Sequence, residues 1–329
     1  MNRQLRLLQV LVAVIALAFV AACVPGSGDA GTIPPPPSTG TPSVEPASPD
    51  ATPGTPEPAT PDPSAPPTGS PTASPSQSPS DATTIVRAYF FLGSFTDNTG
   101  LVPVLREVPR TQAVASAAIT ALLEGPIAAE LGARPAMYTV VPDGTRLLGL
   151  RITDGIATVN LSREFESGGG SMSIFGRLAQ VVYTLTQFPT VTGVSFELDG
   201  QPVTVFGGEG VILDGPVSRD DYQDDQLPEI FVDRPAWGAA AGNPLRVTGM
   251  TRVFEATFQV QLIDAKGGIL DSEMVMATCG TGCWGTFDVT IAYDVASPQW
   301  GTLRVFDYSA RDGAPENVVE YPVWLTPAG

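Results

Sequence analysis

The chain has 329 residues, a formal net charge of −17 and no histidine. The acidic charge argues against nucleic acid as a partner, because phosphate backbones are bound by basic surfaces. Without histidine the chain cannot use Ser-His-Asp or Cys-His catalysis or an imidazole metal site. Carboxylate pairs or a Ser-Lys dyad are then the remaining routes to acid–base chemistry.

Residues 1–22 have the pattern of a lipoprotein signal peptide. Arg3 and Arg6 precede an apolar run, and small residues stand directly before Cys23. A basic start, a short apolar core and a small-residue junction are typical of export signals. We expect cleavage before Cys23, acylation of its thiol (palmitate) and attachment to the extracytoplasmic face of the cell membrane. The alternative is an uncleaved N-terminal helix, although the apolar run is shorter than the ~20 residues of a bilayer span.

Residues 23–83 are predicted to be a disordered tether. Pro, Ser, Thr, Gly, Ala and acidic residues dominate this segment, and it contains no aromatic residue. Such a composition buries too little apolar surface to offset the entropy cost of ordering. The prolines favour extended polyproline II conformations, which make a semi-stiff spacer. Glycosylation of this Ser/Thr/Pro-rich stalk is a hypothesis, with a bare tether as the alternative.

Residues 84–206 are predicted to form an α/β domain that begins with two extended runs. Ile85–Leu92 is rich in β-branched and aromatic residues, and Leu101–Val108 returns after a turn expected at Asp97–Gly100.

Two helices are predicted in the same domain. Thr111 is a candidate N-cap for an alanine-rich helix over Gln112–Glu124. A second helix is expected over Met172–Phe188, where Pro189 would stop it. One continuous apolar stripe marks this helix: Ile174, Leu178, Val181, Val182 and Leu185.

Two hairpins complete the domain, each across an Asp-Gly turn. The first joins Arg146–Ile152 to Ile156–Leu161, and the second joins Val194–Leu198 to Pro202–Phe206. Strands and two helices around one sheet indicate an α+β layer arrangement.

Several motifs in this domain occur in the order found in one known family: Leu122–Pro126, Val141–Thr145, Val159–Ser162 and Gln180–Thr186, followed by Val194–Gly200. On these residues the domain resembles the GerMN (sporulation and spore germination) domain. The resemblance implies a compact α/β fold found in envelope lipoproteins and similar to ring-building modules that associate with copies of themselves. It implies no catalytic residues.

Residues 207–227 are predicted to be an acidic linker. Arg219–Asp225 contains four aspartates, which favours a solvated connector. Calcium binding is the alternative, but the spacing does not match an EF-hand loop.

Residues 228–329 are predicted to form an all-β immunoglobulin-like sandwich, because short runs alternate with turns at regular spacing. Lys266, the single lysine, lies in the hairpin turn Asp264–Gly268, where a solvated loop charge is expected. Seven strands are expected: Ile230–Val232, Leu245–Gly249, Ala256–Ile263, Ile269–Ala277, Gly285–Ala292, Gly301–Phe306 and Val318–Leu325.

This second domain also resembles a known family, the immunoglobulin-like domain of bacterial spore germination proteins, which often follows GerMN. The motifs that carry the resemblance are Asn243–Gly249, Val253–Ala256, Gly285–Phe287, Gly301–Leu303 and Asp307–Gly313.

Cys279 and Cys283 flank a Gly-Thr-Gly interval. In an exported protein such a pair favours a disulfide. Free thiols and a redox-active pair are the alternatives, while a zinc site would need two further ligands.

Three carboxylates are candidates for acid–base chemistry: Glu255, Asp307 and Asp312. Each is also explained as a strand-edge or turn residue, and the sequence pairs none of them with a defined partner. We therefore predict no catalytic residues, no cofactor and no metal site.

Together these features predict a non-catalytic, membrane-anchored lipoprotein on the extracytoplasmic side of the cell envelope. Its partners would be the membrane, through the N-terminal lipid, and envelope proteins, including copies of itself. Its role would be envelope assembly, with sporulation or germination implied by the resemblance. The alternative is a module that binds cell-wall glycan or peptide, and an enzyme that uses carboxylates is a third hypothesis.

Overall fold

The computed structural model describes residues 82–208 and 210–328, all within one compact unit, Ala73–Gly329. The predicted signal peptide, Cys23 and nearly all of the predicted tether lie outside the described residues. Among the described residues, no helix has the length and apolar character needed to cross a bilayer.

The first sheet is built on a long antiparallel hairpin. β1 (Thr83–Ser94) pairs with β2 (Asp97–Pro109), and the short β3 (Met137–Tyr138) pairs with the other edge of β1. Both predicted runs are confirmed, but the turn lies at residues 95–96 and not at Asp97–Gly100. The register shifts at Gly93, and the Ser94 hydroxyl accepts a hydrogen bond from the Asp97 amide (3.1 Å), which closes the hairpin early.

The first predicted helix forms as α2 (Val114–Leu123). It starts two residues later than expected, because the Thr111 hydroxyl accepts a hydrogen bond from the Ala113 amide (3.1 Å) ahead of the helix. The prediction that Thr111 is the N-cap was therefore wrong. A one-turn helix that the sequence did not predict, α3 (Ala128–Leu131), follows α2.

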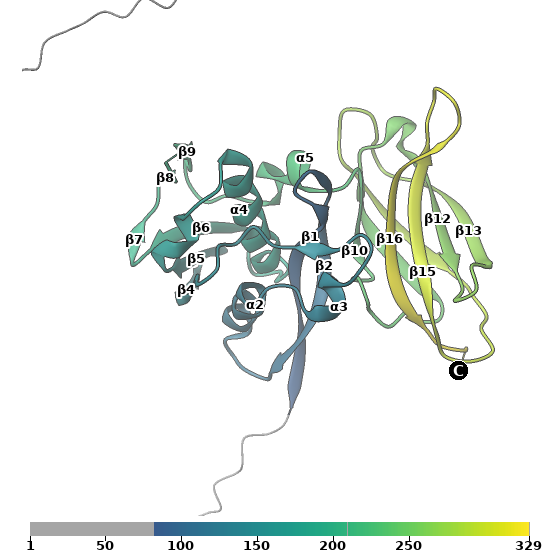
Figure 1. The fold of residues 1–329 in the computed structure, drawn as a ribbon, viewed down its shortest axis with the longest axis horizontal. Coiled ribbons are helices and arrows are strands. Elements are labelled where there is room, and N and C mark those ends of the chain that lie inside the picture. The colour runs from purple at the N-terminus through teal and green to yellow at the C-terminus, as the bar shows by residue number, and fades with distance from the viewer. Residues whose placement is uncertain (1–81, 209, 329) are drawn as a thin grey trace, which may run out of the picture. The chain divides into compact units, whose positions relative to one another are not determined.

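The second predicted helix forms as α4 (Ser171–Leu185), and every residue of its apolar stripe is buried. It ends three residues before the predicted end at Phe188, because the Gln187 side chain bonds to β1. The Gln187 side chain accepts a hydrogen bond from the Arg87 amide (2.8 Å) and donates one to the Arg87 carbonyl (2.7 Å). α4 packs against α2, β1 and β6 (Gly193–Leu198) (Figure 1).

The remaining strands of the α/β domain form a second sheet, so the domain contains more than the one sheet expected. Its order is β4-β5-β6-β7. The predicted first hairpin is confirmed as β4 (Leu147–Thr153) and β5 (Ile156–Leu161), and α4 provides the crossover between β5 and the parallel β6.

The closing hairpin differs from its prediction. Only β7 (Gln201–Pro202) returns along β6. β8 (Val205–Phe206) instead pairs with β9 (Val211–Ile212), which lies in the predicted linker.

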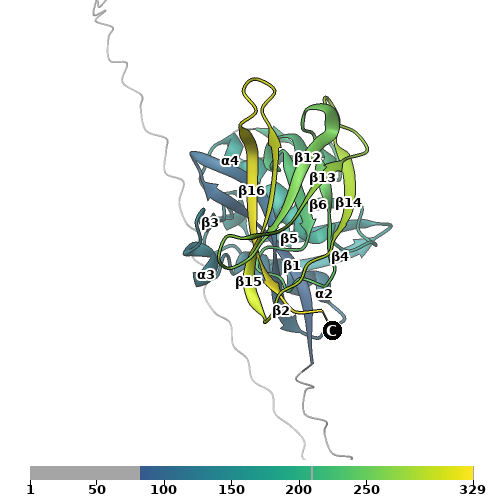
Figure 2. The same ribbon diagram turned by 90° about the vertical axis from the view of Figure 1, so that its right-hand side faces the viewer.

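The sandwich domain has all seven predicted strands, arranged in two sheets (Figure 1, Figure 2). Alternating buried positions such as Phe258, Val260 and Leu262 face the space between the sheets. One sheet contains β10 (Ile230–Arg234), β11 (Leu245–Thr251) and β14 (Gly285–Ile291). The other contains β13 (Ile269–Met276), β12 (Thr257–Ile263), β15 (Gln299–Tyr308) and β16 (Pro315–Leu325).

Short helical turns occupy the connections. They are η1 (Arg163–Glu166), η2 (Arg219–Asp221), α5 (Gln223–Gln226) and η3 (Phe254–Ala256). η2 and α5 belong to the predicted acidic linker, whose aspartates at 220, 221, 224 and 225 are exposed.

One contiguous hydrophobic core contains buried residues of both domains, among them Val182 of α4, Phe231 of β10 and Val260 of β12. The rings of Tyr183 and Phe231 meet edge to face, with centroids 6.0 Å apart. The α/β domain and the sandwich are thus continuous in their packing.

We predict that Gly249→Ala lowers the free energy of unfolding by ~3 kcal/mol, since overpacking a rigid site costs about 1–3 kcal/mol. A Cβ on Gly249 would overlap the carbonyl oxygen of Phe231 and lie 2.7 Å from Phe287 Cζ. Urea unfolding measures the change. Gly149→Ala is the matched control, because a Cβ there meets nothing within 4 Å. Equal stability of the two variants would contradict the packing described for Gly249.

Candidate functional site

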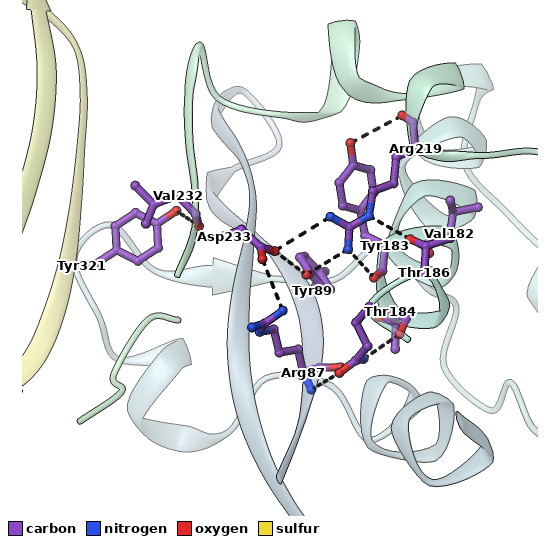
Figure 3. A network of polar contacts seen from close by, with 11 residues as sticks. Arg87, Tyr89, Val182, Tyr183, Thr184, Thr186, Arg219, Val232, Asp233 and Tyr321 are labelled. Carbon is purple, nitrogen blue, oxygen red and sulfur yellow. Dashed lines mark hydrogen bonds and ion pairs between the residues drawn. The ribbon is translucent and has the colours of Figure 1, made fainter. Parts of the chain in front are cut away.

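The polar contacts between the two domains converge on one carboxylate, that of Asp233 in β10 (Figure 3). Tyr89 Oη donates a hydrogen bond to Asp233 Oδ1 (3.0 Å), and Arg87 Nη1 donates one to Oδ2 (3.3 Å). Arg219 Nη1 forms an ion pair with Oδ1 at 3.8 Å. Two guanidinium groups and a phenol from the α/β side therefore share a single acid of the sandwich.

Asp233 is the extra residue of a β-bulge. β10 and β11 pair through Val232 and Gly249, and the register then shifts so that Arg234 pairs with Thr248. An extra residue is left out of the ladder, and bulges commonly redirect a side chain near a functional contact.

Arg219 of η2 holds this cluster to α4 (Figure 3). Its guanidinium donates to the Thr186 hydroxyl (2.8 Å), the Tyr89 hydroxyl (3.2 Å) and the Tyr183 carbonyl (3.3 Å). It also lies over the Tyr183 ring, 4.6 Å from the centroid. Although burial acts to lower the pKa of Arg219, the charge of Asp233 and the hydrogen bond to Tyr89 act to raise it, and that pKa stays above its ordinary value, so the guanidinium is charged.

Tyr89 is fully buried between the two charged partners of the carboxylate. Burial raises the pKa of Tyr89 despite the nearby Arg219 charge. Burial likewise raises the pKa of Tyr183. Both phenols therefore remain neutral, and the Tyr89 hydroxyl acts as a donor to Asp233.

Backbone contacts reinforce the junction. The Trp237 amide donates to the Pro103 carbonyl (2.8 Å), which joins the segment after β10 to β2. Within the sandwich, Tyr321 Oη donates to the Val232 carbonyl (3.3 Å), next to Asp233 (Figure 3).

The connector is tied to the sandwich through Asp224 of α5. Asp224 Oδ1 accepts hydrogen bonds from Trp284 Nε1 (2.7 Å) and from Arg252 Nη1 (3.3 Å). One member of the acidic run thus has a specific partner in addition to solvent. Among the described residues, no group of three or more His, Cys, Asp or Glu side chains is placed to hold a metal ion.

A groove of about 500 Å³ opens beside the Asp233 cluster. Arg219 and Asp233 line it together with residues of β10, β11 and β14. Its lining includes Thr248, Thr278 and Thr286, together with Met250 and Asp288. The hydroxyls of Thr278 and Thr286 are 3.3 Å apart and share a hydrogen bond. The exposed Asp288 pairs with Arg246, and the hydrogen bond from this arginine lowers the pKa of Asp288. The groove can therefore offer hydroxyl, carboxylate and apolar contacts to an extended ligand.

The sequence-predicted carboxylates lie away from this groove. Glu255 and Asp307 line one separate cavity of about 320 Å³, which the sequence did not foresee. Asp307 is buried, which raises its pKa, and it accepts a hydrogen bond from Asn317 Nδ2 (2.9 Å). Asp312 accepts hydrogen bonds from Arg311 and from the Ala314 amide, as expected of a turn residue. Lys266 is exposed in its hairpin turn.

The two late cysteines lie close together in the loop between β13 and β14. Their Cα atoms are 5.9 Å apart, and the structure joins Cys279 and Cys283 through their sulfur atoms. The Cys279–Cys283 disulfide in the native protein stays a prediction that free-thiol titration tests.

Two family models match the chain. Residues 87–204 match Germane, described as sporulation and spore germination. Residues 229–314 match Gmad2, described as the immunoglobulin-like domain of bacterial spore germination. The chain carries a Germane domain followed by a Gmad2 domain. Neither description names a catalytic activity.

Lipoprotein LpqB from Thermobifida fusca (strain YX) is 30% identical over 128 residues, which are 38% of this chain and 20% of that protein. The match thus spans about a fifth of the length of this curated relative.

Two solved structures from Bacillus subtilis are also similar. The first GerMN domain of the sporulation protein GerM is 20% identical, with a TM-score of 0.35, and the match covers 42% of this chain and 100% of that one. The tandem GerMN domains of GerM are 16% identical, with a TM-score of 0.36, and the match covers 64% and 62% of the two chains. With TM-scores of 0.35 and 0.36 these structures carry no argument, and the Germane domain is identified by its family model.

We predict that Asp233→Asn destabilises the protein by about 2 kcal/mol, less than the ~3–5 kcal/mol of a fully buried broken pair. The substitution leaves the charges of Arg87 and Arg219 uncompensated, while the Asp233 side chain is only 25% exposed. Thermal and urea unfolding measure the effect.

Asp288→Asn is the matched control, since it breaks an arginine pair whose aspartate is 53% exposed. Exposed pairs contribute about 0–1 kcal/mol. If Asp233→Asn lost no more stability than Asp288→Asn, the stabilising role of Asp233 would be refuted.

Proposed function

We propose that the protein is a non-catalytic, lipid-anchored protein on the extracytoplasmic face of the cell membrane. In this proposal residues 1–22 are a signal peptide, residues 23–83 a tether, residues 84–206 the Germane domain, residues 207–227 the connector and residues 228–329 the Gmad2 domain. The two domains act together as one platform that binds other envelope components. The family descriptions support a role connected with sporulation or germination.

The observation that carries the proposal is the Asp233 junction. Arg87 and Tyr89 donate hydrogen bonds to Asp233 of the Gmad2 domain, and Arg219 pairs with the same carboxylate at 3.8 Å. A charged cluster used in this way fixes the relative position of two domains. A groove beside a fixed junction is preorganised, and preorganisation lowers the entropy cost of binding.

The groove is the proposed binding surface. Envelope proteins are the proposed partners, and copies of this chain are included among them. The groove lining combines Arg219, Asp288 and Met250, and this mixture of charged and apolar side chains supports a protein segment as the occupant.

Cell-wall glycan is the second candidate. The three threonine hydroxyls in the groove favour it, since hydroxyl groups both donate and accept hydrogen bonds with a sugar.

The experiment places a photoreactive amino acid at position 286 in the groove and, as a matched control, at Ser272, an exposed residue of β13 in the other sheet. After irradiation of intact cells, we expect an envelope-protein adduct from position 286 and none from position 272. Attachment to purified peptidoglycan from position 286 would favour the glycan candidate. Equal labelling from both positions, or from neither, would contradict the groove as the binding surface.

Anchoring is tested separately through Cys23. We predict that Cys23→Ser abolishes incorporation of labelled palmitate and moves most of the protein from the membrane fraction to the medium or the soluble fraction, because one acyl-bearing thiol is the proposed anchor. Cys279→Ser is the control and should leave both readouts unchanged. Undiminished palmitate incorporation in Cys23→Ser would exclude the proposed lipid site.

A further inference from the structure

The cavity of about 320 Å³ that contains Glu255 and Asp307 lies in the sandwich and shares no lining residue with the groove. Its lining comes from η3, from β12 and β13, and from β15 with the loop that follows β15. The β15–β16 hairpin closes at the end of the sandwich away from the C-terminus (Figure 1). The volume is at the lower end of the roughly 300–1,000 Å³ of ligand pockets.

Asp307 is a buried carboxylate without a counter-charge. It is only 5% exposed, and no arginine or lysine among the described residues forms an ion pair with it. Burial raises the pKa of Asp307 and the charges of Glu316 and Glu229 add to this effect, against the hydrogen bond from Asn317. Asp233 shows the contrast, because two arginines surround it. Buried charges in proteins are nearly always paired, so a cation is missing beside Asp307.

One oxygen of the Asp307 carboxylate is free for a ligand. Asn317 Nδ2 donates a hydrogen bond to Oδ1 (2.9 Å). The other oxygen, Oδ2, accepts no hydrogen bond from another described residue and is not enclosed by the fold. Arginine pairs best with both oxygens of a carboxylate, whereas a lysine ammonium is a compact charge with three rotatable donors. A single free oxygen therefore favours an ammonium over a guanidinium group.

The rim of the cavity suits the same kind of ligand. Phe254, Met274 and Tyr308 line it and are 60%, 72% and 55% exposed. Aromatic faces attract cations, and apolar side chains cover the methylene groups of a lysine stem. The hydroxyl of Ser309, which also lines the cavity, can bond to the main chain of a peptide.

The backbone around the two carboxylates has an uncommon conformation. Of the described non-glycine residues with left-handed φ, Asp154 and Asp199 precede a glycine in a tight turn. The others are at this cavity: Glu255 (57°), Ala256 (60°) and Asn317 (54°). Left-handed backbone at non-glycine residues is costly and gathers at functional sites.

The loop between the two cysteines holds this backbone in place. The Glu255 amide donates a hydrogen bond to Thr281 Oγ1 (3.3 Å). A Cβ on Gly280 would come within 2.3 Å of the Ala256 nitrogen, so this loop lies directly against η3. Glu255 is therefore positioned by a second loop, although its side chain is exposed.

We infer that this cavity binds the ammonium group of a lysine side chain on a partner protein, with Asp307 Oδ2 and the Glu255 carboxylate as its acceptors. The net charge of −17 favours a basic partner. The chain's single lysine, Lys266, follows the far end of β12 from the cavity residue Thr257, so it does not fill the cavity of its own molecule. The site does not depend on the groove.

The test uses the full chain in lipid nanodiscs, with ¹³C in its methionine methyl groups, and N-acetyl-lysine methylamide as the probe. We expect a saturable shift of the Met274 methyl signal with a Kd on the order of millimolar, as is usual for so small a ligand. N-acetyl-norleucine methylamide has the same carbon chain without the ammonium group, and it should bind about 5-fold more weakly or worse, since the charge supplies the affinity. N-acetyl-arginine methylamide should also bind more weakly than the lysine probe, because only one oxygen of Asp307 is free.

Two variants test the acceptors. Asp307→Asn removes the charge at constant size and should weaken binding of the lysine probe about 5-fold or more. Glu255→Gln changes an exposed side chain, which leaves the buried packing intact, and should also weaken binding. Glu273→Gln is the matched control: it removes an exposed acid next to Met274 that does not line the cavity, so the Kd should change less than about 2-fold.

The proposal is overturned by the absence of a saturable shift, by equal binding of the lysine and norleucine probes, by tighter binding of the arginine probe, or by undiminished binding to Asp307→Asn and Glu255→Gln. Binding of n-butylamine as tight as that of the lysine probe would assign the cavity to a free amine and overturn the protein lysine. A Met274 shift that grows with protein concentration in the absence of any probe, and that Lys266→Gln abolishes, would overturn a different partner in favour of a second copy of this chain.

Discussion

The structure depends on one shared carboxylate. Asp233 accepts hydrogen bonds from Tyr89 and Arg87 and pairs with Arg219, and these contacts join β10 of the Gmad2 domain to β1 and η2. Taking charges out of water is costly unless they are paired with good geometry. At this junction the cost is offset only while the two domains stay together, so the electrostatics couple their positions.

The surrounding packing strengthens that coupling. Tyr183 contacts Arg219 with its ring face and Phe231 with an edge-to-face arrangement, so one side chain serves the polar cluster and the common core. The groove lies beside this junction and includes both Arg219 and Asp233 in its lining. Any change that loosens the junction would alter the groove as well. A fixed two-domain body would present the same surface to every partner.

Sequence patterns predicted the strands well because alternation and turn chemistry are local. The sandwich strands follow alternating residues such as Phe258, Val260 and Leu262, and the first Asp-Gly hairpin formed where expected. Helix ends were less predictable, since tertiary partners decided them: the Gln187 side chain ends α4 by bonding to Arg87, 100 residues away.

The junction had no local signal in the sequence. Arg87 and Asp233 are 146 residues apart in the sequence. Arg219 lies in an aspartate-rich segment, and these aspartates led to the prediction of a solvated linker. Residues that act through long-range contacts cannot be recognised from periodicity or spacing along the sequence.

The most direct test of the account is the distance distribution between spin labels at Ile152 in β4 and Ser272 in β13, measured by pulsed electron paramagnetic resonance on the protein in solution with Cys23 replaced by serine. A domain pair held by Asp233 predicts one narrow distribution that broadens in Asp233→Asn. A broad or multimodal distribution in the unchanged junction would contradict the claim that the Germane and Gmad2 domains act as a single body.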